Sequence, residues 1–255
     1  MEPYYYQTLS KAEQSSYQAM QAGLQAFAPS FPVPLLENRA LTDVFMKLRL
    51  DCPQLFYAGT FQYRYYPDSR NAELIPAYLF EKGKMKHQKA LQARVEKLVR
   101  PVARCSDEEK LLYIHDFICK NVRYDKLKKQ YSHEIIGVLG HGVGVCEGIA
   151  KAVKILCDAL QIQCIIALAE NNPEKGVKYR HAWNVVRLDK KYYHLDCTFD
   201  LPLGNPEEIR YDYFLLSDKQ IFRDHERLVW RVPACEDADR FYYKKKKLSF
   251  TKTEE

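Results

Sequence analysis

The sequence lacks the long apolar run that a membrane-spanning helix needs, although 47% of its 255 residues are hydrophobic. It also lacks repeats, low-complexity tracts and an obvious flexible linker. Together with an ordinary charged fraction of 28%, this indicates a globular protein of one large or two small domains. The first residues, MEPYYYQTLSKAEQ, have neither the basic part nor the apolar part of a signal peptide. We therefore expect a cytoplasmic protein that does not bind membranes.

No Cys-x-x-Cys pair occurs among the eight cysteines, which stand at positions 52, 105, 119, 146, 157, 164, 197 and 235. A structural zinc site usually takes two ligands from one short turn, so no metal is expected. In a reducing compartment most of these cysteines are expected to serve as small apolar residues. A functional cysteine must therefore be identified from its surroundings.

Nucleic-acid-binding motifs are also missing, although the net charge is +6. Basic residues gather in three stretches, EKGKMKHQKA, KNVRYDKLKKQ and YYKKKKLSF. Without an accompanying motif, such stretches are more often solvated surface than a nucleic-acid interface. We expect no nucleic acid among the partners.

Residues 1–100 are expected to form a helical or mixed N-terminal region. Ser10 and Glu13 have the spacing of a capping box, which predicts a helix start, and Pro53 should end a second helix. The predicted helices are 8–27, 38–52 and 84–100, and the predicted strands are 59–68 and 73–80.

Residues 101–255 are expected to form the second domain. Ser106 and Glu109 predict a helix start, followed by apolar residues on one face. Strand-like segments follow at 163–170, 181–188, 191–199 and 212–218. Helices followed by strands indicate an α+β fold in which helices pack on an antiparallel sheet.

Cys146 stands between a glycine-rich run and a predicted helix, in GHGVGVCEGIAKAVKIL, residues 140–156. The apolar positions that follow are spaced by three and four residues and mark one buried stripe; they are 149, 152, 153, 156 and 160. A helix N-terminus offers unpaired N–H groups and the positive end of the helix dipole, and both favour a nucleophilic thiolate. The G-x-G-x-G pattern is no dinucleotide fingerprint, so no cofactor is expected.

His181 and Asp196 are the expected base and orienting group for this cysteine. A tight turn at 189–190 would pair residues whose numbers sum to 379, which places His181 diagonal to Asp196 on one sheet face. A register shifted by one residue would send Asp196 to the other face.

Other histidines compete for the role of base. His194 shares the strand face of Asp196, and His141 lies five residues before Cys146. The histidines at 87, 115, 133 and 225 stand in polar or helical surroundings and are interpreted as ordinary residues. A metal site built from cysteine, histidine and aspartate lacks a compact ligand cluster in the sequence.

GVGVCEGIAKAVKIL, HAWNVV and YYHLDCTFD, in this order, resemble the Cys, His and Asp motifs of the transglutaminase-like superfamily. The resemblance runs roughly from residue 106 to residue 200, and residues 1–100 look like the leader of some bacterial members. It implies a papain/transglutaminase-like fold with Cys146 as nucleophile, His181 as base and Asp196 as orienting group. Phe199 departs from the pattern, because many relatives carry tryptophan there.

The resemblance also narrows the expected chemistry to acyl transfer on protein or peptide amides. The paired-cysteine zinc motifs of the peptide:N-glycanase branch are absent, and the length leaves no room for the calcium-binding and barrel domains of animal tissue transglutaminases. We expect hydrolysis, as a peptidase or amidase. A protein-crosslinking transglutaminase and a non-catalytic binding or scaffolding module are the alternatives. The oligomeric state stays open.

Oxyanion stabilisation is expected from the backbone N–H of Cys146. Tyr124 is a candidate second donor because of its position upstream.

Overall fold

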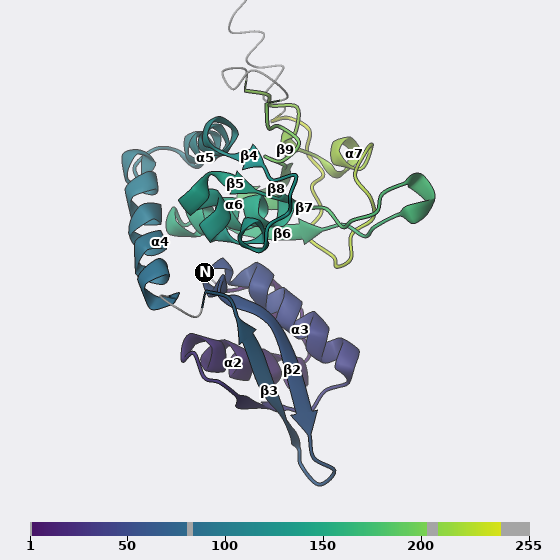
Figure 1. Ribbon diagram of the computed structural model, residues 1–255. Helices are drawn as coiled ribbons and strands as arrows, with labels where there is room; N and C mark the ends of the chain where they lie inside the picture. Colours follow the sequence, from purple (N-terminus) through teal and green to yellow (C-terminus); the bar gives the residue numbers. More distant parts are fainter. Residues whose placement is uncertain (1, 81–83, 203–208, 241–255) are drawn as a thin grey trace, which may run out of the picture. The chain divides into compact units, whose positions relative to one another are not determined.

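The computed structural model describes residues 2–80, 84–202 and 209–240. The chain divides into two compact units, Met1–Ala90 and Leu91–Glu255, and the division falls within helix α4 (Lys84–Val99) (Figure 1). Within the described ranges, no helix combines the length and the apolar character needed to cross a membrane. The basic stretch at 242–250 lies outside the described residues.

The first unit combines helices with a three-stranded antiparallel sheet of order β1-β3-β2 (Figure 1). Its helices are α1 (Tyr4–Gln7), α2 (Lys11–Gln25) and α3 (Asn38–Asp51), followed by a 3-10 turn at Pro53–Leu55. Its strands are β1 (Phe31–Pro34), β2 (Ala58–Tyr65) and β3 (Asn71–Tyr78).

Local signals explain most of this first unit. Ser10 and Glu13 form the predicted capping box, and α3 ends before Pro53 as expected. Strand β1 was not predicted, because its two prolines break the helix and remove backbone donors. It lies at the sheet edge, where such a strand is tolerated.

The second unit contains a four-stranded antiparallel sheet of order β6-β7-β8-β9 and a separate two-stranded parallel pair, β4-β5. The sheet strands are β6 (Cys164–Leu168), β7 (Ala182–Leu188), β8 (Lys191–Leu195) and β9 (Phe214–Leu216), and the pair is β4 (Arg123–Tyr124) with β5 (Val143–Gly144). The helices are α5 (Asp107–Asn121), α6 (Cys146–Ala159) and α7 (Asp218–Ile221). Short 3-10 helices lie at Arg100–Val102, Gln130–His133 and Pro173–Lys175, and a π-helix lies at Ile136–Gly140.

Helix α6 packs on strands β6 and β7 (Figure 1). The predicted apolar stripe is buried, as every one of its five residues shows. Two polar bonds fasten the helix to the sheet: Asn184 Nδ2 donates to the Ala150 carbonyl at 2.9 Å, and Lys154 Nζ donates to the Cys164 carbonyl at 3.0 Å. The expected α+β arrangement, with the cysteine-bearing helix on an antiparallel sheet, is confirmed.

The β7–β8 hairpin has the predicted register, since Asn184 lies opposite Leu195 and Val185 opposite His194. Asp189 and Lys190 form the two-residue turn, both with positive φ, +49° and +67°. Such a turn matches the twist of the flanking strands. The sequence predicts a strand over 191–199 that includes Asp196. Strand β8 instead ends at Leu195, so Asp196 is the first residue after the strand.

Candidate active site

Cys146 is the first residue of α6, directly after the extended Val145. The chain approaches it through β5, which pairs with β4, and the Val145 N–H donates to the Ser132 carbonyl at 3.0 Å. Gly142 has φ +66°, a conformation that L side chains rarely adopt. The predicted delivery of the cysteine to a helix start is therefore confirmed.

Gly148 permits a close approach in the first turn of α6. A Cβ at this position would lie 2.2 Å from the Ser132 carbonyl oxygen. The same holds at Gly144, where a Cβ would lie 2.6 Å from Val138 Cγ2. Because these two residues have no side chain, the first turn of α6 can pack directly on residues 131–134. This packing fixes the position of Cys146.

Lys151 anchors this first turn from the protein interior. Its side chain is fully buried, and Nζ lies 2.9 Å from both carboxylate oxygens of Glu134 and 2.7 Å from Glu147 Oε1. Nζ also donates to the His133 carbonyl at 3.2 Å. Since Glu147 follows Cys146 directly, this buried ion cluster holds the backbone around the cysteine.

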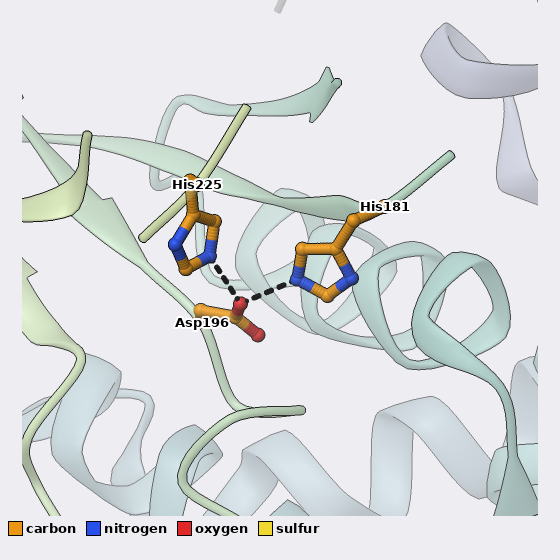
Figure 2. Close-up of side chains that lie close together, drawn as sticks. All are labelled: His181, Asp196 and His225. Carbon is orange, nitrogen blue, oxygen red and sulfur yellow. Dashed lines mark hydrogen bonds and ion pairs between the residues drawn. The ribbon is translucent and has the colours of Figure 1, made fainter. Parts of the chain in front are cut away.

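His181 and Asp196 form the shortest bond of the site, with Nε2 of the histidine 2.6 Å from Oδ2 of the carboxylate (Figure 2). His181 immediately precedes β7 and keeps 20% of its side chain exposed, whereas Asp196 is buried. The other carboxylate oxygen, Oδ1, accepts from the N–H groups of Thr198 at 2.8 Å and Phe199 at 3.2 Å. The carboxylate is thus fixed by the turn that follows β8.

The pKa values of this pair move in opposite directions. Burial by itself lowers the pKa of His181, but the charge of Asp196, the hydrogen bond to Asp196 and a hydrogen bond to Cys146 together raise it to about 10. Burial raises the pKa of Asp196, but the charge and hydrogen bonds of His181 and His225 outweigh burial and hold it well below its usual range. Cys146 and Asp196 therefore both interact with the His181 ring, and Nδ1 points away from Asp196 (Figure 2).

His225 also binds Asp196, which the sequence did not reveal. Its Nε2 lies 2.9 Å from the same Oδ2 that His181 contacts (Figure 2). Its Nδ1 lies 2.7 Å from Asp224 Oδ1. The interpretation of this residue as ordinary was wrong, because its side chain is buried. It follows β9 and α7 in a polar segment, DHERL, whose pattern gives no sign of burial.

The rival histidines are engaged elsewhere. His194 is buried and accepts from Trp183 Nε1 at 2.9 Å, while its Nε2 lies 2.7 Å from Asp218. His141 is exposed and packs on the Tyr131 ring. Of the histidines described, His181 is the one whose ring interacts with both Cys146 and Asp196.

His115 also departs from its sequence interpretation. It is fully buried on α5, and its Nε2 lies 3.0 Å from Asp200 Oδ2. Asp200 in turn accepts from the Tyr213 N–H at 3.1 Å. This pair ties the segment after Asp196 to α5 and β9.

Two groups within the described ranges bring metal-ligand atoms within 4.8 Å of one another: His181, Asp196 and His225, and His194, Asp218 and Cys235. Two imidazoles with one carboxylate suit several transition metals. In both groups, histidine nitrogens and the aspartate oxygen lie 2.6–2.9 Å apart, which is hydrogen-bond distance. These histidines and aspartates thus bond to one another.

Tyr124 stands near Cys146 at the end of β4, opposite Gly144. Burial, followed by the charges of Cys146 and Asp125, raises the pKa of its phenol. With 41% of its surface exposed, the side chain reaches solvent beside the cysteine.

Residues 94–197 match the family model of the transglutaminase-like superfamily. The match includes Cys146, His181 and Asp196 and ends before His225. The segment that holds the candidate site resembles the transglutaminase-like superfamily. Members of this superfamily are typically thiol enzymes with a Cys-His-Asp group. No curated protein sequence matches the chain.

Solved structures with some likeness to this chain include three named proteins. A TGase is 14% identical, with a TM-score of 0.37 over 61% of this chain and 48% of its own. A candidate cysteine protease from Cytophaga hutchinsonii is 16% identical, with a TM-score of 0.36 over 57% of this chain and 63% of its own.

The third, menin, was solved with attention to its binding site for the Mixed Lineage Leukemia protein. It is 22% identical, with a TM-score of 0.33 over 48% of this chain and 27% of its own. The chain thus spans less than two thirds of each of these proteins.

Proposed function

We propose that this chain is a thiol acyl-transfer enzyme that acts on protein or peptide amides, with Cys146 as nucleophile. The position of the His181 ring supports this proposal most strongly. The ring bonds Asp196 at 2.6 Å through Nε2 and also interacts with the Cys146 thiol. A nucleophile, a base and an orienting carboxylate in this order are the arrangement that thiol acyl transfer requires.

The reaction begins when His181 takes the proton of the Cys146 thiol. The sulfur attacks the amide carbonyl, and the negative charge moves to the carbonyl oxygen, where the Cys146 backbone N–H stabilises it. His181 then gives its proton to the leaving nitrogen, the C–N bond breaks, and a thioester and a free amine result. Tyr124, beside Cys146, is the proposed second donor to the oxygen.

Water is the proposed acceptor of the acyl group. His181 removes a proton from the water as it attacks the thioester, and the C–S bond breaks to give a carboxylic acid and the thiol. Transfer to an amine instead needs a place that holds an uncharged amine and excludes water. The sequence offers no such feature, which favours a peptidase or amidase over a crosslinking enzyme.

One experiment separates the possible outcomes. The chain is incubated with a glutamine-containing protein mixture and a tagged primary amine, and cleavage, deamidation and tagging are followed by mass spectrometry. Hydrolytic products that disappear in Cys146→Ala support the proposal. Tagging that outruns hydrolysis would establish the crosslinking alternative, and no product dependent on Cys146 would favour a non-catalytic module.

A further inference from the structure

The carboxylate of Asp196 accepts from four donors. Oδ1 is used by two backbone N–H groups, and Oδ2 is shared by the imidazoles of His181 and His225 at 2.6 and 2.9 Å (Figure 2). An ionised carboxylate has about four lone-pair sites, two on each oxygen, so these four donors fill it. His225 and His181 therefore draw on the negative charge of the same oxygen.

His225 is held in place for this contact from all sides. Its ring packs against the rings of Phe199, Trp183 and Tyr213, with centroids at 4.6, 4.8 and 5.6 Å. At its far nitrogen, Nδ1, it faces Asp224, which also accepts from the Tyr213 hydroxyl. Both ring nitrogens of His225 thus face carboxylate oxygens, which accept when they are ionised.

We propose that His225 is a positioning residue of the catalytic group: it fixes Asp196 and, by sharing Oδ2, limits how strongly Asp196 holds the proton of His181. This inference rests on the proposed function, since a proton held too firmly by His181 is poorly given to a leaving amine. The residue acts through Asp196 and lies outside the segment that matches the family model.

Other titratable groups lie within electrostatic reach of Asp196, namely His194, Cys197, Asp200 and Tyr213. Three of them have partners of their own: His194 faces Asp218, Asp200 faces His115, and Tyr213 donates to Asp224. Cys197 is fully buried, and burial first of all raises the pKa of its thiol. His181 itself faces Asp196 and Cys146 and packs beside the rings of Trp183, Phe199 and His225.

The proton on His181 can be followed directly by a ¹H–¹³C NMR titration of the histidine rings in the full chain. His181 is assigned from the signal missing in His181→Ala. In His225→Phe, which keeps an aromatic ring but removes the donor, the pKa of His181 should rise by about one unit, a tenfold change in its proton affinity. In His225→Gln, which keeps an N–H donor, the pKa of His181 should rise by less than in His225→Phe.

Because the His225 side chain is buried, its variants can fail to fold, and a substitution at an exposed neighbour gives an independent test. Asp224 keeps 46% of its side chain exposed, so Asp224→Asn should fold. The loss of this charge weakens the donation from His225 to Asp196, and the pKa of His181 should rise by less than in His225→Phe. Asp212→Asn, which removes a similarly exposed carboxylate that pairs with Arg210, is the matched control and should cause no shift.

An unchanged His181 titration in both His225→Phe and Asp224→Asn would overturn the inference and leave His225 a packing residue. The titration needs no substrate. Failure of the proposed function would instead appear as the absence of products that depend on Cys146, so the two failures are distinguishable.

Discussion

His181 Nε2 and Asp196 Oδ2 lie 2.6 Å apart although 15 residues separate them in the chain. The contact exists because the two-residue turn at Asp189 and Lys190 sets the register that brings the start of β7 beside the end of β8. In the proposed mechanism this bond orients the ring toward Cys146. A change that weakens this hydrogen bond should therefore lower activity.

Asp196→Asn keeps the shape of the side chain but removes its charge. An amide no longer favours the imidazolium, and its N–H₂ end can force the wrong tautomer on His181. We expect kcat/KM for hydrolysis of an amide substrate to fall by about 10⁴, the loss seen for the equivalent change in a serine-protease triad. Asp107→Asn, at the exposed start of α5, should retain full activity. Equal activity in the two variants would contradict the assigned role.

The stability of the protein should depend on pH through the same pair. The pKa of His181 is raised from 6.5 to about 10, so its contribution is complete below pH 6.5 and is lost as pH rises through about 10. The pKa of Asp196 is lowered from 3.8, so its contribution is complete above that value and is lost in acid.

The Tm difference between the unmodified protein and His181→Gln should therefore be greatest between about pH 4 and 6.5. It should shrink steadily toward pH 10. Thermal unfolding across this range measures it, and a difference that is independent of pH would show that the ion pair does not form.

The buried ion cluster behind Cys146 makes a prediction about folding. Lys151→Met leaves Glu134 without its buried partner, so the free energy of unfolding should drop by about 3–5 kcal/mol. Lys120→Met removes an ammonium that is 56% exposed and 3.9 Å from Asp116, and should change stability by less than about 1 kcal/mol. Denaturant unfolding compares the two, and similar losses would argue against a special role for the cluster.

Two glycines near the cysteine should respond differently to alanine. Alanine normally stabilises a helix relative to glycine, but in Gly148→Ala the new methyl would meet the Ser132 carbonyl at 2.2 Å. We expect a loss of about 1–3 kcal/mol in the free energy of unfolding. In Gly140→Ala the nearest atom is 3.6 Å away, and stability should hardly change. A stable Gly148→Ala protein would mean that α6 does not need this close approach.

The sequence could predict those features that depend on local pattern or on spacing. The capping boxes at Ser10 and Ser106, the buried stripe of α6 and the β7–β8 register are confirmed. Each follows from residues that lie close together in the chain or across a two-residue turn.

The features it could not predict depend on contacts between distant segments. His225 reaches Asp196 across 29 positions, and His115 reaches Asp200 across 85. His225 stands in a polar segment whose pattern gives no sign of burial. His115 has helical spacing to the buried Leu111 and Ile118, but the carboxylate that compensates for its burial comes from a distant segment. Strand β1 escaped prediction for a related reason, since its pairing with β3 overrides the local preference of its prolines.

Alkylation with iodoacetamide at pH 6 shows whether His181 activates Cys146, because an ordinary thiol of pKa about 8.5 is protonated at this pH. Cys105, also half-buried, is the internal reference. Mass spectrometry of the unmodified protein should show Cys146 labelled at least about ten times faster than Cys105. His181→Ala should remove most of that difference. Equal rates at the two cysteines, or a ratio that His181→Ala leaves unchanged, would show that His181 does not activate Cys146.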